Sequence, residues 1–211
     1  MKLFFVILVA VVLAGCNGSQ DIARLTAHQA ATIRSLNQEV TRLNQEMDEL
    51  IHSREDLAKA KAELEMKLRR ELAAGDMSVS MKNRGLVVTL LDRILFDSGK
   101  AELKPSAQIV LDKLAGTLAS KAEENMIYVE GHTDNQPILY SGWRSNWELS
   151  TARATEVIHY FIEARGLNPR QFAATGYGEY HPVSSNESAQ GRVANRRVEI
   201  VISPRKFDDL S

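Results

Sequence analysis

The chain has 211 residues, of which 44% are hydrophobic and 25% are charged, and its 26 basic side chains nearly balance 27 acidic ones. This composition excludes a disordered chain and a bundle of membrane helices, and the near-neutral charge gives no strong field that would attract nucleic acid. The length suits one ordinary domain of about 100–150 residues with an appended segment.

The first predicted element is a leader, "MKLFFVILVAVVLAGC", in which Lys2 precedes an apolar run from Leu3 to Ala14. The run is too short to span a hydrocarbon core of about 30 Å and is typical of the apolar region of a signal peptide. We therefore expect residues 1–15 to be a signal peptide that takes no part in the fold.

The last four residues of this leader, "LAGC", resemble a bacterial lipobox, and they end in Cys16, the only cysteine of the chain. The resemblance implies cleavage before Cys16 and acylation of its sulfur by chains such as palmitate, with residues 16–21 as a lipid-anchored tether. Asn17 stands where lipoproteins retained in the inner membrane commonly have Asp, so the resemblance implies an outer-membrane anchor that faces the periplasm. The alternative is a small-residue cleavage site with an incidental cysteine.

A long helix is predicted from about Ile22 to Leu72, because this stretch contains neither Gly nor Pro. Its apolar residues follow a heptad, with leucines at position d and mostly aliphatic residues at position a. The d residues are Leu36, Leu43, Leu50, Leu57 and Leu64, and the a residues are Ile33, Val40, Met47 and Leu68. This pattern favours two parallel strands, so we predict a parallel homodimer through residues 22–72.

Two basic residues, Arg54 and Lys61, interrupt the a column and leave alternatives open. The stripe of apolar residues at a and d would then pack on a partner helix or on the chain's own domain. The other alternative is that the segment is a single charged helix. About 50 helical residues would form a rod of about 75 Å. The residues "AAGD" end the helical pattern, so we predict a coiled-coil segment over 22–75 and a domain over 76–211.

The C-terminal segment has the alternating elements of an α+β domain. "GLVVTLLDRILFDSG" predicts one or two strands, Pro105 begins an amphipathic helix to about residue 122, and "MIYVEGH" predicts the next strand. A capping box, Ser145 to Glu148, begins a helix that ends before Gly166, and strands follow at 172–178 and 196–203. The predicted order is β-α-β-α-β-β, with helices against one face of a mixed sheet.

Five successive segments of this domain resemble the OmpA/MotB C-terminal domain, the peptidoglycan-associated module. They are "ILFDSGKAELKPSAQIVLDKLA", "IYVEGHTDNQPI", "SNWELSTARATEVIHYFI", "ATGYGEYHPV" and "GRVANRRVEIVI". The match covers about residues 86–203. The longer loop between "HTDNQPI" and "SNWELS" is most similar to the MotB-like branch, although the lipobox disfavours a stator role.

The resemblance implies binding of peptidoglycan stem peptides through diaminopimelate, whose side-chain end carries an ammonium and a carboxylate. Asp134 and Arg153 match the two charged contacts of the family, since an Asp accepts from an ammonium and an Arg grips a carboxylate. Asn146, Leu149 and Arg153 share one face near the start of a helix, whose free N–H groups favour an anion. Thr133 is a weaker candidate.

Each of these residues also has a simpler interpretation. Asp134 and Thr133 are typical of loop caps and turns, Asn146 is a candidate helix cap, and Arg153 is a candidate solvated charge. Arg196 is a candidate supporting contact, or a charge that protects a sheet edge. The loop aromatics Tyr140 and Trp143 are candidates for stacking on sugar rings, and Trp147 is expected in the core.

An enzyme that cuts the cell wall is the rival class. Glu130, His132 and Asp134 alternate along one strand and would need a further ligand or carboxylate to form a metal or acid pair. No zincin or nucleophile-elbow motif is present. We expect a non-enzymatic tether, without metal or cofactor, that links the outer membrane to peptidoglycan. The alternative is a coiled-coil scaffold of an envelope or secretion assembly, or a MotB-like stator component, that uses wall binding only for positioning.

Overall fold

The computed structural model describes residues 2–121, 125–139 and 141–204, with side chains from residue 22 onward. The chain divides into two compact units, Met1–His52 and Ser53–Ser211. Cys16 and the predicted signal peptide lie outside the described side chains, so the lipidation of Cys16 stays a prediction.

Helix α1, Lys2–Lys67, runs through the whole first unit and continues into the second. From residue 22 to the end of the first unit its large apolar residues are exposed, among them Leu36 (58%), Leu43 (48%) and Met47 (59%). Among the described residues, no helix combines the length and the apolar character that crossing a bilayer requires.

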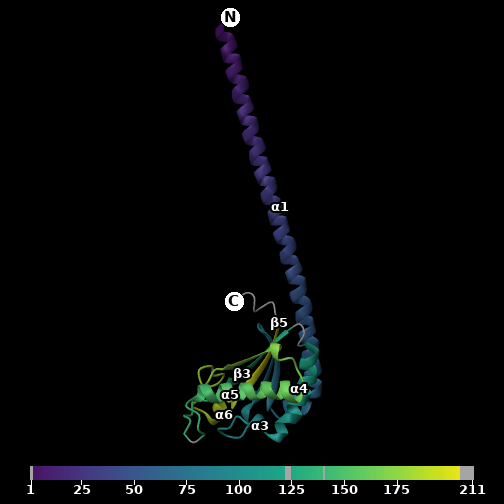
Figure 1. Ribbon diagram of the computed structural model, residues 1–211, viewed down its shortest axis with the longest axis vertical. Coiled ribbons are helices and arrows are strands. Elements are labelled where there is room, and N and C mark those ends of the chain that lie inside the picture. The colour runs from purple at the N-terminus through teal and green to yellow at the C-terminus, as the bar shows by residue number, and fades with distance from the viewer. Residues whose placement is uncertain (1, 122–124, 140, 205–211) are drawn as a thin grey trace. The chain divides into compact units, whose positions relative to one another are not determined.

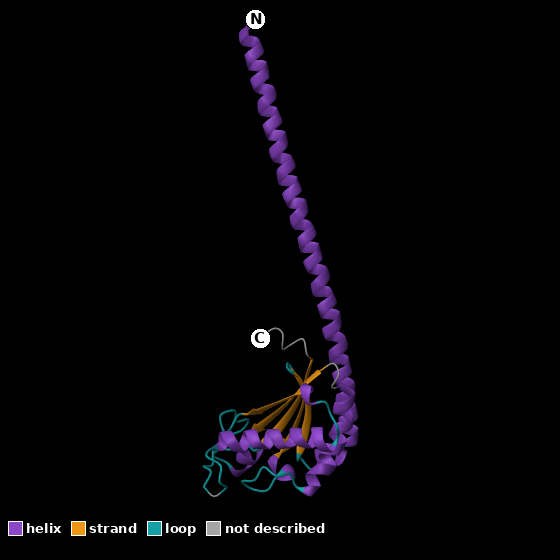
Figure 2. Ribbon diagram, in the orientation of Figure 1, coloured by secondary structure: helices purple, strands orange, loops and turns teal. Residues whose placement is uncertain are grey.

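The second unit contains a mixed five-stranded sheet in the order β1-β2-β5-β3-β4. Its strands are drawn in orange in Figure 2. The strands are β1 (Met77–Lys82), β2 (Gly85–Leu91), β3 (Asn125–His132), β4 (Phe172–Gly176) and β5 (Arg197–Pro204). All neighbours are antiparallel except β3 and β4, which are parallel because α5 connects them as a crossover. The predicted α+β class with a mixed sheet is confirmed.

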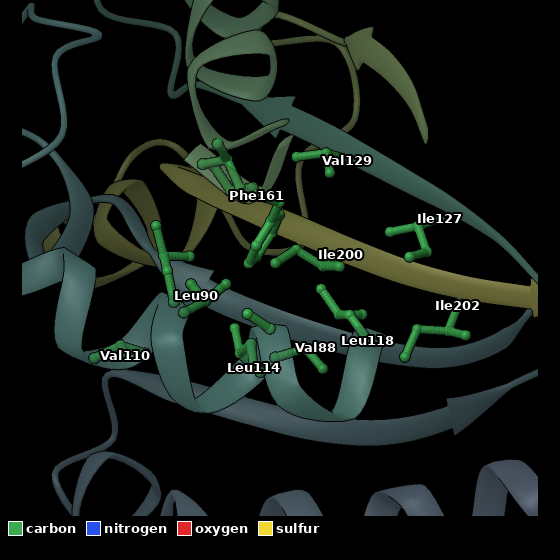
Figure 3. Close-up of a cluster of buried hydrophobic side chains, with 14 of the residues drawn as sticks. Val88, Leu90, Val110, Leu114, Leu118, Ile127, Val129, Phe161, Ile200 and Ile202 are labelled. Atoms are coloured by element: carbon green, nitrogen blue, oxygen red, sulfur yellow. The ribbon is translucent and has the colours of Figure 1, made fainter. Parts of the chain in front are cut away.

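The helices of this unit pack on one face of the sheet (Figure 1). They are α4 (Pro105–Lys121) and α5 (Asn146–His159), which continues as a π-helical turn, η1 (Tyr160–Ala164). Shorter helices are α2 (Arg69–Ala73), α3 (Asp92–Leu95), a 3-10 turn, η2 (Pro169–Gln171), and α6 (Ala189–Asn195). Alternate strand residues, including Val88, Ile127 and Ile200, meet Leu114, Leu118 and Phe161 in a continuous apolar core (Figure 3).

Two elements differ from the sequence expectation. The segment "MSVSMK" forms edge strand β1, which pairs with β2 from Met77↔Leu90 to Lys82↔Gly85. This strand was not predicted from the sequence, because its serines alternate with Met and Val along a half-buried edge and no continuous apolar run marks it. The segment after Leu91 is the short helix α3 rather than a second strand.

The end of α1 is part of the domain core. Leu57, Ala60, Leu64 and Leu68 are each at most 2% exposed and belong to the same apolar cluster as the sheet. Lys113 on α4 reinforces this packing through an ion pair of 2.6 Å with Glu71. The compact unit therefore begins at Ser53, upstream of the boundary that we predicted near residue 75. One of the open alternatives, a stripe that packs on the chain's own domain, applies to this part of the helix.

Candidate functional site

A pocket of about 890 Å³ opens beyond the end of β3, between the start of α5, the segment 91–104 and the junction of α6 with β5. All the predicted ligand-binding residues line it: Thr133, Asp134, Asn146, Leu149, Arg153 and Arg196. Gly131 permits this arrangement, because a Cβ there would lie 2.0 Å from the carbonyl oxygen of Ser150. The close approach of α5 to the end of β3 brings Asn146 and Arg153 to the loop that carries Asp134.

Asp134 forms an ion pair with Arg196, which ends α6. Its other carboxylate oxygen accepts from the backbone N–H of Gln136 at 3.2 Å, so the loop itself orients the carboxylate. The side chain of Asp134 is 7% exposed, whereas that of Arg196 is 37% exposed. The guanidinium of Arg196 therefore reaches solvent, whereas the carboxylate that it pairs with is buried.

Arg153 is held much more deeply. Its side chain is 3% exposed and contacts Asp92 at 3.0 Å, and its Nε donates to the carbonyl oxygen of Lys100 at 2.9 Å. The guanidinium also lies over the ring of Phe96, with 5.1 Å to the ring centroid. The interpretation of Arg153 as a solvated charge is wrong, because the residue fixes the segment 92–100 to α5.

Four of the charged residues that line the pocket, Asp92, Asp134, Arg153 and Arg196, influence one another. Burial raises the pKa of Asp92, and the cations of Arg153 and Arg196 oppose that rise. Burial likewise lowers the pKa of Arg153, and the carboxylates of Asp92 and Asp134 oppose that fall. Two anions and two cations thus form one partly buried cluster that a zwitterionic ligand can enter without leaving a net charge unpaired.

Asn146 does not cap the helix, because Ser145 is the N-cap and accepts from the backbone N–H of Trp147 at 3.2 Å. The side-chain amide of Asn146 instead donates to the carbonyl oxygen of Gln136 at 3.1 Å and to Glu179 at 2.9 Å. Asn146 therefore fastens the loop after β3 to the loop after β4. Ser145 is confirmed as the N-cap, and its hydroxyl donates to Glu148, the other residue of the predicted capping box.

Thr133 and Leu149 complete the wall. The backbone N–H of Thr133 donates to Gly178 at 2.9 Å, and its buried hydroxyl has no hydrogen-bond partner among the described residues. A buried hydroxyl without a partner at a pocket wall is free to bond a ligand. Leu149 is 4% exposed and supplies apolar surface.

Several residues of the pocket were not predicted from the sequence. Asp92 pairs with Arg153, Phe96 supports that guanidinium, and Lys104 donates to the carbonyl oxygen of Arg93 at 2.9 Å. The sequence predicts one or two strands for residues 85–99, which include Asp92 and Phe96, and it assigns no function to these side chains. Glu179 was also missed, because only the tertiary fold brings it to Asn146.

The residues of the rival catalytic site are not brought together. Glu130 forms a bidentate ion pair with Arg84, at 2.7 and 2.9 Å, and Asp134 pairs with Arg196. His132 is 5% exposed and stacks on Tyr177 at a centroid distance of 5.0 Å. No group of metal-ligating side chains occurs within the part of the chain that the structure describes.

The aromatic residues near the pocket differ from expectation. Trp147 is 45% exposed and stacks on Tyr180, so its predicted place in the core is wrong. Trp143 is half-buried, and its indole N–H donates to the carbonyl oxygen of Gly99 at 3.0 Å. Tyr140 lies outside the described residues.

Comparisons with known proteins agree on one family. Residues 95–196 match the model of the OmpA family. The chain is 39% identical to Motility protein B of Bacillus subtilis (strain 168) over 151 residues, which are 72% of this chain and 58% of that protein. It is 31% identical to the probable lipoprotein YiaD of Escherichia coli (strain K12) over 140 residues, 66% of this chain and 61% of the relative.

A solved structure shows the same fold. It is the cell wall anchor of the T6SS from Pseudomonas aeruginosa, with 34% sequence identity and a TM-score of 0.61, and the match covers 67% of this chain and 97% of that one. The chain spans only about half to three fifths of the length of the curated relatives it matches.

Proposed function

Because this chain belongs to the OmpA family through residues 95–196, we propose that its pocket binds the diaminopimelate of peptidoglycan stem peptides. The observation that carries the proposal is the pocket itself, in which Asp134 and Arg196 form one ion pair and Asp92 and Arg153 form another. A similar solved structure described as a cell wall anchor supports the proposal. On this account the protein is a tether that breaks no bond.

The chemistry of the ligand suits these charges. The side-chain end of diaminopimelate is a zwitterion, so its ammonium takes the place of Arg196 beside Asp134. The released Arg196 then meets the ligand carboxylate from the solvent side, while the charge of Arg153 attracts it from the buried side. The free hydroxyl of Thr133 and the first turn of α5 provide further hydrogen bonds.

The proposed attachment at the other end is a lipid. Acyl chains on Cys16 would hold the protein in the outer membrane facing the periplasm, since each buried CH₂ contributes about 0.8 kcal/mol and such lipoproteins carry two or three chains. The similarity to a probable lipoprotein of Escherichia coli supports this part of the proposal. Mass spectrometry of the protein purified from membranes tests it, and an unmodified Cys16 would contradict it.

We further propose that the exposed stripe of α1 pairs with a second copy of the chain. Its aliphatic residues at a and leucines at d favour a parallel two-stranded coiled coil. The pairing ends near Leu50, because the next leucines of the heptad, Leu57, Leu64 and Leu68, are already buried in the domain.

Co-sedimentation of the purified full chain in detergent with isolated sacculi tests the wall binding. We expect wild-type protein to sediment with the sacculi and Asp134→Asn to stay in the supernatant. Arg93→Gln is a matched control, because Arg93 lines the rim but is 58% exposed and pairs with Asp76 outside the cluster. Thermal unfolding of each variant verifies that the fold is retained.

Two outcomes would contradict the proposal: wild-type protein that stays in the supernatant, or a folded Asp134→Asn protein that sediments as well as wild type. Arg153 is a poor first target for substitution. Its loss leaves Asp92 buried without its partner, which typically costs about 3–5 kcal/mol of stability.

A second candidate is a scaffold of an envelope or secretion assembly that uses the wall only for positioning. The similar cell wall anchor of a T6SS favours it. Deletion of residues 22–50 distinguishes the tether from the scaffold. A tether tolerates a shorter spacer in proportion to the gap that it spans, whereas a scaffold loses the site at which its partner binds. The deletion must stop before Ser53, where the domain begins.

A further inference from the structure

Trp147 and Tyr180 form an exposed aromatic pair. Their rings stack at a centroid distance of 5.2 Å and an interplanar angle of 24°, and 45% of Trp147 and 60% of Tyr180 face solvent. Stacking of one ring on the other restricts both side chains, so the pair presents a rigid apolar surface. Two exposed rings held together in this way can serve as a stacking surface for a ligand.

The aromatic pair is connected through neighbouring residues to the pocket that is proposed to bind the stem peptide, here called the peptide pocket. Trp147 follows Asn146, and Tyr180 follows Glu179, and the side chains of Asn146 and Glu179 are hydrogen-bonded at 2.9 Å. Asn146 lines the pocket and Glu179 does not, so Trp147 is the residue that follows the pocket wall in the chain, and its ring stacks on Tyr180. Trp147 is turned about 100° from Asn146 on the helix, so a ligand held in the pocket would have to pass around Asn146 to reach the aromatic rings.

Beyond Trp147 the outer face of α5 forms an open, shallow groove of about 630 Å³, which shares no lining residue with the pocket. It is lined by Trp147, Glu148, Thr151, Ala152, Thr155, Glu156 and His159. The groove contains two carboxylates and no Lys or Arg, so it disfavours phosphate-rich polymers and anionic lipid.

The hydroxyls of the groove suit a neutral polar chain. Thr151 and Thr155 donate their hydroxyl protons to backbone carbonyls at 2.8 and 2.9 Å, which leaves the oxygens free to accept. A sugar ring has apolar C–H groups on its face and hydroxyl donors around its edge. It therefore matches an aromatic surface that is followed by hydrogen-bond acceptors.

We propose that Trp147, Tyr180 and the groove along α5 bind the glycan strand of peptidoglycan next to the stem peptide held in the pocket. The inference rests on the proposed function, because the peptide brings its own glycan strand past Asn146. Peptide and sugar would then be recognised together, so the protein would favour stem peptides that are still attached to the glycan.

Calorimetric titration of the full chain in detergent with two soluble probes tests this inference. One probe is a diaminopimelate-containing stem peptide, and the other is the same peptide attached to its disaccharide. We expect wild-type protein to bind the disaccharide peptide roughly fivefold to tenfold more tightly, which corresponds to one stacking contact of ordinary strength.

The variants locate that preference. Trp147→Ala and Tyr180→Ala should reduce the affinity for the disaccharide peptide to that for the free peptide and leave the free-peptide affinity unchanged, which also shows that the fold is intact. Trp147→Phe, which keeps an aromatic face, should retain most of the preference. Ile109→Ala is the matched control, because Ile109 is 61% exposed on α4 and lines neither the pocket nor the groove.

Each failure has a separate meaning. If wild-type protein binds both probes equally, or if the two aromatic substitutions leave the preference intact, the glycan site is contradicted and the peptide pocket stands. If wild-type protein binds neither probe, the proposed function itself is contradicted.

Discussion

The two parts of helix α1 carry the same heptad and differ in what covers it. Leu43, in the first unit, is 48% exposed, whereas Leu64, three heptads later, is 1% exposed and packs in the core of the domain. The stripe thus belongs to the domain from Leu57 onward and remains open before it. An apolar period shows that a face will be buried, but it does not identify the partner.

The two parts of α1 should therefore contribute to two different properties: the stability of the domain and the association of the chain with a partner. Residues that the domain buries contribute to its free energy of unfolding in a single chain. Residues that the chain leaves open contribute only when a second copy or another partner covers them. Substitutions in the two parts of one helix should therefore change different measurements.

The largest effect is expected from Leu64→Ala. Truncation of a buried leucine typically costs about 2–5 kcal/mol, so the domain should unfold at a clearly lower denaturant concentration. Leu43→Ala is the matched control and should change this transition by less than about 0.5 kcal/mol. Equal destabilisation by the two substitutions, measured by urea unfolding, would break the distinction between the two parts.

Mild acid should destabilise the domain by a smaller amount. Burial, together with the charge of Arg197, lowers the pKa of His132 to about 3, so the folded state holds this imidazole neutral. The unfolded chain binds a proton below pH 6.5, so stability is full above that pH and falls as the pH decreases toward 3. The loss should reach about 2 kcal/mol at pH 5.

Urea unfolding of His132→Gln between pH 7 and pH 5 verifies the assignment. The substitution should remove most of this pH dependence, whereas the control His159→Gln, whose side chain is 56% exposed, should keep it. A wild-type domain that is equally stable at both pH values would show that His132 is not held neutral by the fold.

The smallest free-energy change is expected for Leu43→Ala in the proposed coiled coil. The substitution removes the Leu43 side chain, which is 48% exposed in a single chain, from both helices of the pair. It should weaken self-association roughly tenfold and leave the folded domain unaffected. Analytical ultracentrifugation of the full chain measures the dissociation constant, and Gln45→Ala is the control at an exposed polar position. A chain that is monomeric at all concentrations would exclude a second copy as the partner of the stripe.

The sequence predicted most of the fold, because its helices and central strands have clear periods and caps. The resemblance to the OmpA/MotB C-terminal domain, rather than any local pattern, identified Asp134 and Arg196 as site residues, and the structure places both in one pocket with Asn146. The sequence did not predict the depth of Arg153 or the role of Asp92, since both depend on how α5 packs on the segment after β2.

The aromatic pair shows the same limit. Trp147 begins an amphipathic helix, and its size favoured the core. Tyr180 lies in a distant loop, and only the tertiary fold brings its ring onto Trp147. Local pattern therefore identifies which residues are apolar, and packing decides which of them reach solvent.

The central claim is that the pocket recognises both charges of diaminopimelate. Calorimetric titration of the full chain with a stem peptide that contains diaminopimelate, and with the same peptide containing lysine, tests it most directly. The side chain of lysine keeps the ammonium and lacks the carboxylate, so one charge-assisted contact is lost. We therefore predict that the lysine peptide binds at least roughly tenfold more weakly than the diaminopimelate peptide. Equal affinities for the two peptides would contradict the account.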